Sequence, residues 1–363
     1  ARGGFGIVYV AEQLATERRV ALKLLSAHWH GDSIERLLSE ARIAARLSSE
    51  HVVQVFDAGI DAESSLVFVA MELLSGTDLA ELVLNQGPRS ARDTVEYLRQ
   101  VAIGLDKVHG LVASDGHAAP IVHRDLKPAN LFLTRREDGS PWIKILDFGA
   151  AKVLSQNTLS SGALRGTPQY MAYEQASGGA VTPATDIWAL GLIAFYLLTA
   201  RSYWLGAQSE SGQTQIFAEV LTLTLVPASQ RARELEAPAP LSAAFDQWFF
   251  RCVNRDASKR FASAGEAARE LGRALGVPIS SVSPPVATSE VLSGHHSSLT
   301  PAAKVPTSDL AAVVQSARKP RVPRSRLLLA AALLAVVAVA AWLSGRVRPE
   351  PPLTTAPASA AAS

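Results

Sequence analysis

Cysteine is almost absent from this chain of 363 residues, which contains only Cys252. A single cysteine excludes an intramolecular disulfide and any zinc site built from several cysteines, and it fits a folded part kept in a reducing cytosol. We interpret Cys252 as a small buried hydrophobic residue rather than a reactive thiol. A large charge excess is also absent, because the formal net charge is +2. There is therefore no basic field of the kind that nucleic-acid binding requires, and no nucleic-acid partner is expected.

An initiator methionine is missing as well, since the chain opens on ARGGFGIVYV, and we expect a truncated N-terminus. The glycines of this stretch fit the phosphate-binding pattern G-x-G-x-x-G-x-V at Gly3, Gly6 and Val8. Ala1 stands in the place of the first glycine of that pattern. By itself the stretch is either a loop that covers phosphates or a glycine-rich chain end.

Residues 1–275 have the patterning of a globular domain. FGIVYVAEQ and RRVALKLL predict an antiparallel pair of strands, and VVQVFDAG and LVFVAMELL predict two more. Apolar residues at helical spacing predict helices over SIERLLSEARIAARLSS, ARDTVEYLRQVAIGLDKVHG and DIWALGLIAFYLLTA. Strands followed by helices indicate an α+β protein with two unequal lobes.

The C-terminal part has a different composition. Residues 276–326 are rich in Pro, Ser and Thr, which predicts a disordered linker; His295 and His296 within it lack the neighbouring ligands of a metal site. Residues 327–343 are uncharged and apolar, and as a helix they would extend roughly 25 Å. A buried core helix is the alternative, but flanking basic clusters and the absence of neighbouring elements favour a single transmembrane helix.

The distribution of basic residues predicts the orientation of that helix. Five of them precede it and two follow it closely: Arg318, Lys319, Arg321, Arg324 and Arg326, then Arg346 and Arg348. The larger cluster is expected to stay inside, so we predict an inner (plasma) membrane protein with a cytoplasmic N-terminal domain. Residues 344–363 would form a short extracytoplasmic tail. A signal peptide is excluded by position.

The stretch IVHRDLKPANLFL has a spacing that carries chemistry. A tight loop of this length aims Asp125 at a substrate hydroxyl, turns Asn130 toward a metal ion, and leaves Lys127 near a transferred phosphoryl group. A solvated charged turn would not require this order of residues. In the following KILDFGAAK, Asp147 ends a strand-like run, and its carboxylate suits Mg²⁺.

With these motifs in order, the chain resembles the eukaryotic-like protein kinase family over residues 1–275. GTPQYMAYEQ matches the end of the activation segment, TDIWALG bears the buried Asp186, and RDASKRF supplies Arg260, which in the family pairs with Glu174. The resemblance implies a bilobal fold. We expect a β-rich N-lobe over 1–71, a hinge over 72–76 and a helical C-lobe over 77–275.

The resemblance also implies phosphoryl transfer from ATP, with Mg²⁺ (Mn²⁺ as an alternative) bound by Asn130 and Asp147. Lys23 of VALK would hold the α- and β-phosphates, oriented by Glu40, with Glu35 as the second choice and a solvated helix face as the plain alternative for either. Lys127 would offset charge on the γ-phosphate, and Asp125 would accept or orient the proton of the hydroxyl. The residues expected to contact ATP are Gly3, Gly4, Gly6, Val8, Ala21, Lys23, Met71, Glu72, Leu74 and Phe132.

Within that pocket, Val8, Ala21 and Phe132 would sandwich the adenine and Met71 would be the gatekeeper, although each is also an ordinary core residue taken singly. HRDLKPAN and GTPQY resemble the Ser/Thr branch, and Arg124 implies control by phosphorylation of the activation segment. The acceptor candidates are Thr158, Ser160, Ser161 and Thr167. We expect Thr167 rather to line the substrate site, and a generic Ser-rich loop is the alternative for the others.

Three features depart from the family pattern: Ala1, Tyr173 in the place of a proline, and two insertions, GLVASDGHAAPI and TRREDGSPW. The leading hypothesis is a membrane-anchored bacterial Ser/Thr kinase that acts on protein substrates and autophosphorylates, with a homodimer as a further expected arrangement. The alternative is a pseudokinase that binds nucleotide or serves as a scaffold. A small-molecule kinase is disfavoured by the full activation segment.

Overall fold

The computed structural model describes residues 2–3, 6–25, 49–61, 64, 66–112, 116–148, 168–208 and 212–278. Several predicted features lie outside these residues: Gly4, the helix carrying Glu35 and Glu40, Thr158, Ser160, Ser161, Thr167, and everything from 279 onward.

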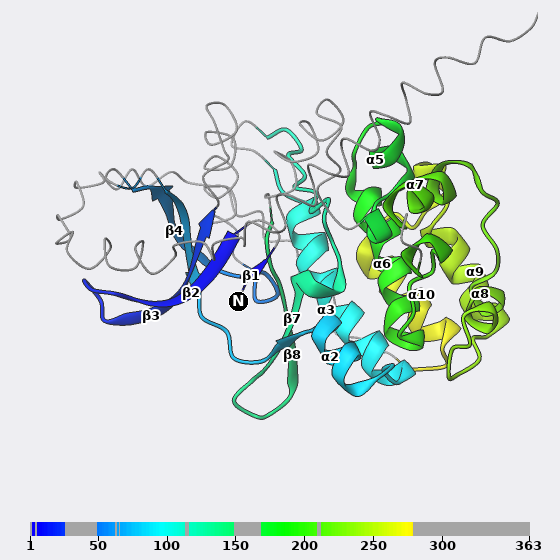
Figure 1. Cartoon of the computed structure of the whole chain (residues 1–363), viewed down its shortest axis with the longest axis horizontal. Helices are drawn as coiled ribbons and strands as arrows, with labels where there is room; N and C mark the ends of the chain where they lie inside the picture. Colours follow the sequence, from blue (N-terminus) through cyan, green and yellow to red (C-terminus); the bar gives the residue numbers. More distant parts are fainter. Residues whose placement is uncertain are drawn as a thin grey trace, which may run out of the picture. The chain divides into compact units, whose positions relative to one another are not determined.

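A five-stranded antiparallel sheet forms the N-terminal lobe, in the order β1-β2-β3-β5-β4. Its strands are β1 (Arg2–Gly3), β2 (Gly6–Gln13), β3 (Arg18–Leu25), β4 (Val55–Ile60) and β5 (Val67–Glu72). The predicted antiparallel pair is confirmed, with Val8 opposite Lys23 in the register of β2 and β3. The blue strands β2 and β3 lie side by side in Figure 1.

The strand predicted over VVQVFDAG begins later than expected, at Val55. Val52 forms an isolated bridge with Ile145 instead, and Val53 N donates to Ile145 O at 2.9 Å. The apolar run therefore serves two purposes, because its first residues attach this lobe to a strand of the second sheet.

The second sheet is small and lies between the first sheet and the helices (Figure 1). It consists of β6 (Thr77–Asp78), β7 (Leu131–Arg135) and β8 (Pro141–Ile145). The insertion TRREDGSPW forms the turn between β7 and β8, where Gly139 has a φ of +80° that favours glycine.

The C-terminal lobe is helical. Its α-helices are α2 (Leu79–Gln86), α3 (Ala91–His109), α5 (Tyr173–Ser177), α6 (Pro183–Thr199), α7 (Gly212–Thr222), α8 (Ala228–Glu234), α9 (Ala243–Cys252) and α10 (Ala264–Ala274). Helices α3, α9 and α10 begin directly after serines whose hydroxyls accept hydrogen bonds from the first turn: Ser90, Ser242 and Ser263. Such caps satisfy backbone N–H groups that the helix itself leaves unpaired.

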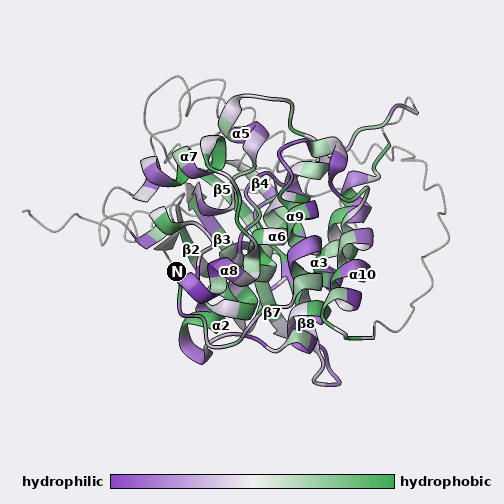
Figure 2. Ribbon diagram, turned by 90° about the vertical axis from the view of Figure 1, so that its right-hand side faces the viewer, coloured by the Kyte–Doolittle hydropathy of each residue, from purple (hydrophilic) through white to green (hydrophobic). Residues whose placement is uncertain are grey.

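Helix α6 is the centre of this lobe. It is apolar around its whole circumference and almost every residue from Thr185 to Thr199 is buried, as expected for a helix surrounded by others. It packs against α3, α9 and α10, which surround it in Figure 2. Trp188 and Phe195 on this helix are fully buried, and Cys252 of α9 is buried as well.

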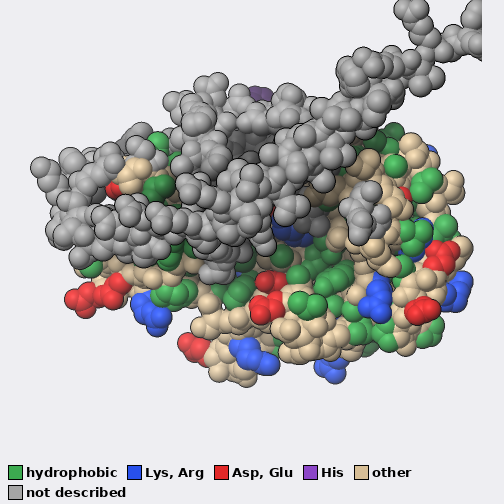
Figure 3. Space-filling view, viewed as in Figure 1, with side chains coloured by type: hydrophobic (Ala, Val, Ile, Leu, Met, Phe, Trp, Pro, Cys, Tyr) green, Lys and Arg blue, Asp and Glu red, His purple; other side chains and the backbone are tan. Residues whose placement is uncertain are grey.

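The predicted bilobal fold, a β-sheet lobe followed by a helical lobe, is confirmed for the described residues. Among them, no helix combines the length and apolar character needed to cross a bilayer; the span predicted at 327–343 is not among the described residues. On the face seen in Figure 3, the described acidic and basic side chains are interspersed rather than gathered by sign.

Candidate active site

The loop that carries Asp125 is bound by the side chain of Asp186 in α6. One carboxylate oxygen of Asp186 accepts from His123 N at 2.9 Å and the other from Arg124 N at 3.0 Å. His109 Nε2 lies 2.8 Å from Asp186 Oδ2. These contacts hold Arg124 at a φ of +68°, a conformation that residues other than glycine rarely adopt. The loop is therefore anchored to the most buried helix of the lobe.

The side chains of the loop converge on the Asp125 carboxylate. Lys127 Nζ donates to Asp125 Oδ2 at 2.7 Å, and Asn130 Nδ2 lies 3.3 Å from the same oxygen. Asn130 Nδ2 also donates to the backbone oxygen of Asp125 at 2.8 Å. Because the amide nitrogen of Asn130 is engaged, its amide oxygen is the atom left to bind a cation.

Leu146 connects this loop to Asp147. Leu146 N donates to Asn130 O at 2.8 Å, and Leu146 O lies 2.8 Å from His123 Nε2. Asp125 N donates to His123 Nδ1 at 3.3 Å, so Nδ1 is the acceptor and Nε2 carries the proton toward Leu146. The backbone N–H and C=O of Leu146 thus fasten Asp147 beside the loop of Asp125 and Asn130.

Asp147 and Lys23 join the two lobes directly. Lys23 Nζ lies 2.5 Å from Asp147 Oδ1, and the lysine side chain is only 11% exposed. Lys23 is in β3 between β2 and β5, paired with Val8 and Val69 in their registers. Asp147 has a φ of +57°, which aspartate tolerates better than most residues. Glu40, the predicted partner of Lys23, lies outside the described residues.

Apolar side chains from both lobes form a cluster that includes residues of β3 and Leu146. Buried Ala21, Val53 and Met71 form a cluster, against which Val8, Val69, Leu73, Leu74 and Leu146 pack. Four residues expected to contact adenine therefore meet: Val8, Ala21, Met71 and Leu74. The sequence analysis did not single out Val53 and Leu146, because apolar residues in strand-like runs are normally interpreted as core residues. Phe132 is half-buried on β7, opposite Lys144, outside the described members of this cluster.

Glu72 follows Met71 and its side chain has a structural partner. Glu72 Oε1 accepts from Lys144 Nζ at 2.7 Å and from Gln54 N at 2.8 Å. Lys144 belongs to β8, so this ion pair links the end of β5 to the second sheet. Sequence reasoning did not single out Lys144, since a lysine in a strand usually faces solvent.

The glycine stretch folds back on itself. Gly3 of β1 lies opposite Gly6 of β2 in an antiparallel register, and Gly4 between them is not described. The second and third glycines of the pattern thus pair with each other at the edge of the sheet that carries Lys23. Glycine backbone, which has no side chain, can approach a phosphate closely.

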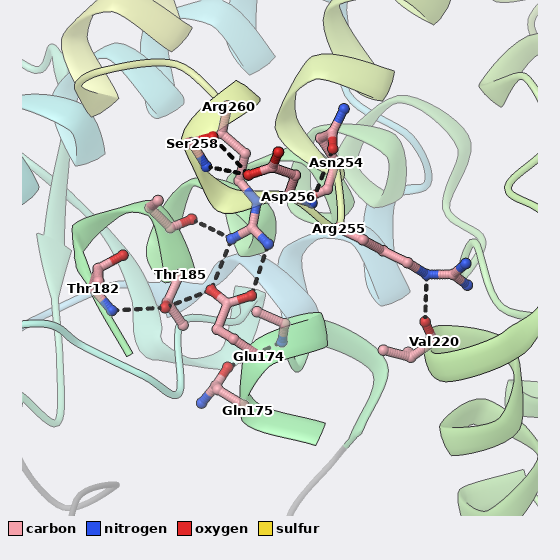
Figure 4. Close-up of polar contacts among 12 residues, drawn as sticks. Glu174, Gln175, Thr182, Thr185, Val220, Asn254, Arg255, Asp256, Ser258 and Arg260 are labelled. Carbon is pink, nitrogen blue, oxygen red and sulfur yellow. Dashed lines mark hydrogen bonds and ion pairs between the residues drawn. The ribbon is translucent and has the colours of Figure 1, made fainter. Parts of the chain in front are cut away.

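The predicted structural pair of Glu174 and Arg260 is present (Figure 4). Arg260 Nη1 and Nη2 donate to the two Glu174 oxygens at 2.8 and 2.7 Å, and Thr185 Oγ1 donates to one of them at 2.7 Å. Burial alone would raise the pKa of Glu174, but the hydrogen bonds from Arg260 and Thr185 outweigh it and lower that pKa. Tyr173, in the place of a proline, packs against the lobe's core.

The site fits a nucleotide with a divalent cation. Asp147 and Asn130 offer a carboxylate and an amide oxygen, the hard ligands that Mg²⁺ prefers. Lys23 and Lys127 add two ammonium groups, one paired with Asp147 and the other with Asp125, and the apolar cluster around Ala21 offers a surface for a base. Each of the two lysines is paired with a carboxylate. When a nucleotide binds, phosphate oxygens could replace the carboxylates as partners of the lysines, and a cation could replace the lysines as the partner of the carboxylates.

Comparison with known proteins agrees with this geometry. Residues 1–270 match the protein kinase domain family, and the chain therefore belongs to it. Serine/threonine-protein kinase Pkn1 of Myxococcus xanthus is 36% identical over 72% of the chain. Serine/threonine-protein kinase PknK of Mycobacterium bovis is 32% identical over 78% of the chain. The domain is accordingly of the serine/threonine kinase type.

These alignments cover 35% of Pkn1 and 24% of PknK, so the chain matches only a minor part of either relative. Among solved structures, the PknI kinase domain of Mycobacterium tuberculosis superimposes with a TM-score of 0.57 at 24% identity. The match covers 76% of this chain and 93% of that one. At this identity the likeness supports the fold alone.

Proposed function

We propose that this protein transfers the γ-phosphoryl group of ATP to serine and threonine hydroxyls of proteins, its own chain included. The main support is the pair of hydrogen bonds at Leu146, which fastens the loop of Asp125 and Asn130 to the residue before Asp147. Lys23 then reaches Asp147 from the other lobe. These contacts connect the residues proposed as general base, cation ligands and phosphate-binding lysine.

Each side chain has a role that its contacts make suitable. Asp125 would orient the substrate hydroxyl and accept its proton on a carboxylate oxygen. Lys127, now bound to that carboxylate, would turn to the γ-phosphate, and Lys23 would bind the α- and β-phosphates. Asp147 and Asn130 would hold Mg²⁺, which neutralises phosphate charge when bound. Catalysis would then rest on positioning and electrostatics.

Incubation of the purified chain with Mg²⁺ and γ-labelled ATP tests this function. Wild type is expected to label itself and casein, whereas Asp125→Asn, which keeps the shape but cannot accept a proton, should lose labelling and retain nucleotide binding. Asp138→Asn in the exposed turn between β7 and β8 is the matched control and should be fully active. Phosphosite mapping then decides among Thr158, Ser160, Ser161 and Thr167.

The pseudokinase alternative has no support from the comparisons, and the labelling experiment addresses it directly. A wild-type chain that binds ATP but labels nothing would overturn the proposed activity in favour of a nucleotide-binding scaffold. Mixing wild type with a size-tagged Asp125→Asn chain tests transfer between two copies. Label on the tagged chain would support a homodimer, and label on the wild type alone would argue against it.

We further propose a single-pass membrane anchor at residues 327–343, with the kinase domain in the cytoplasm. Support comes from the sequence alone: an uncharged apolar run with the larger basic cluster on its N-terminal side. Cell fractionation of the full chain and of a variant lacking 327–343 tests it. Recovery of the full chain in the soluble fraction would refute the anchor.

A further inference from the structure

Gln175, near the start of α5, contacts two segments with its two amide atoms. Its Oε1 accepts from Ala172 N at 3.0 Å, which caps the N-terminus of α5. Its Nε2 donates to Arg124 O at 2.8 Å, across 51 residues of sequence. The two bonds define the orientation of the amide, since one position requires an acceptor and the other a donor.

The oxygen that Gln175 binds belongs to the peptide group joining Arg124 to Asp125. The preceding amide, Arg124 N, is held by Asp186, and the amide of the same peptide group, Asp125 N, donates to His123 Nδ1 at 3.3 Å. Among the described residues, Gln175 is the partner that holds this peptide from its oxygen side. Since Arg124 has a φ of +68°, its backbone is strained and needs such contacts to keep its geometry.

Helix α5 is itself well anchored, which makes it a suitable reference for the loop. Glu174, the neighbour of Gln175, is bound to Arg260 by two hydrogen bonds and is buried (Figure 4). Figure 4 shows the Gln175 side chain leaving α5 away from that pair. A rigid ion pair on one side of the helix thus supports an amide directed at the catalytic loop on the other.

We propose that Gln175 is a positioning residue for phosphoryl transfer, holding the peptide between Arg124 and Asp125 so that the Asp125 carboxylate stays aligned. The inference rests on the proposed kinase activity. It connects the helix that ends the activation segment to the catalytic loop through one side-chain amide. The effect should fall on turnover rather than on ATP binding, because neither bond of Gln175 involves Lys23 or the apolar cluster around Ala21.

Two substitutions separate positioning from helix stability. Gln175→Glu retains an acceptor for Ala172 N but replaces the donor to Arg124 O with a carboxylate oxygen that repels it. Gln175→Met, similar in volume, removes both bonds and serves if the glutamate variant does not fold. Gln100→Ala is the matched control: Gln100 is buried, donates to Pro141 O and accepts from Ile143 N, away from the catalytic loop.

The test measures kcat, KM for ATP and hydrogen–deuterium exchange of residues 121–133 in the full chain. Gln175→Glu is expected to melt only a few degrees earlier and to keep its ATP KM, but to lose about tenfold in kcat, the cost of one carbonyl hydrogen bond. Gln100→Ala should melt earlier with its kcat retained. A kcat of Gln175→Glu within twofold of wild type would overturn the inference.

Hydrogen–deuterium exchange tests the contact of Gln175 with the loop even if the chain shows no turnover. Faster exchange over 121–133 in Gln175→Glu, but not in Gln100→Ala, is expected. An inactive wild type would refute the proposed kinase activity. In that case, the role of Gln175 in holding the loop would be refuted if Gln175→Glu showed the same exchange over 121–133 as wild type.

Discussion

Removing the guanidinium of Arg260 should destabilise the helical lobe strongly. The Arg260 side chain is fully buried and that of Glu174 is 9% exposed. Arg260→Ala would leave the carboxylate with Thr185 as its remaining side-chain partner and would also free the carbonyls of Ala184 and Asn254. Breaking one side of a buried ion pair costs about 3–5 kcal/mol, because a charge is left uncompensated in a poorly polarisable environment.

Urea and thermal unfolding measure this loss. A change of about 4 kcal/mol corresponds to a melting temperature lower by roughly 8–16 °C for a domain of this size class. Lys259→Ala is the matched control, since the neighbouring Lys259 is 68% exposed and pairs with Asp256 at 3.5 Å. An exposed pair of this kind contributes about 0–1 kcal/mol, so the control should unfold close to wild type.

The dependence on pH provides a second criterion. The pKa of Glu174 is lower in the folded than in the unfolded protein, so the folded state binds fewer protons there. Its stabilising contribution is therefore complete above the ordinary glutamate pKa and is lost as pH falls through the lowered folded value. In Arg260→Ala, burial would instead raise the Glu174 pKa, and acidification would relieve the unpaired charge.

The gap in stability between wild type and Arg260→Ala should consequently narrow from pH 7 to about pH 4. A gap under about 1 kcal/mol at pH 7, the range of an exposed pair, would refute the reasoning about buried charge. So would a large gap that stays constant over this pH range, because the loss would then come from packing.

Three other predictions concern residues that the structure ties to the site. Lys144→Gln should raise the KM for ATP several-fold with little change in kcat in steady-state assays, because Glu72 at the end of β5 loses its ion pair across the lobes. Asp186→Asn should lower the free energy of unfolding by about 1–3 kcal/mol in urea unfolding and reduce kcat, since an amide cannot accept on both sides and Arg124 or its neighbours lose a partner. Cys252 should react with a thiol reagent only after unfolding, because burial raises its pKa well above the ordinary value and removes the thiolate; rapid reaction in the native state would contradict this.

Much of the fold and site was predictable because the signals are local in sequence. The spacing of Asp125, Lys127 and Asn130 defines a single loop. The apolar face of α3 and the long apolar run of α6 identify these helices before any contact is known. The ion pair of Glu174 with Arg260 came from the family resemblance rather than from local sequence. The start of β4 was wrong by a few residues because an apolar run does not indicate which of its members pair within the sheet and which bridge to Ile145.

The contacts that sequence could not provide join segments far apart in the chain. Lys144 meets Glu72 across 72 residues, and Gln175 meets Arg124 across 51. Lysine and glutamine are ordinary surface residues, so neither position carries a local signal of its role. Their partners are defined only when the chain has folded and has brought β8 to the end of β5 and α5 to the loop of Asp125.

Strained backbone at two residues of the site explains why these long-range contacts matter for chemistry. Arg124 and Asp147 both have positive φ, a conformation that costs on the order of 1–3 kcal/mol outside glycine. Asp186 and Gln175 hold the first, while the hydrogen bonds of Leu146 hold the peptide before the second. Because Asp186 belongs to the buried α6, the strain is balanced by packing in the core of the helical lobe rather than by the site itself. In the proposed reaction, the backbone of Asp125 and Asp147 would then stay in position while only the ion pairs of their side chains exchange for a nucleotide and its cation.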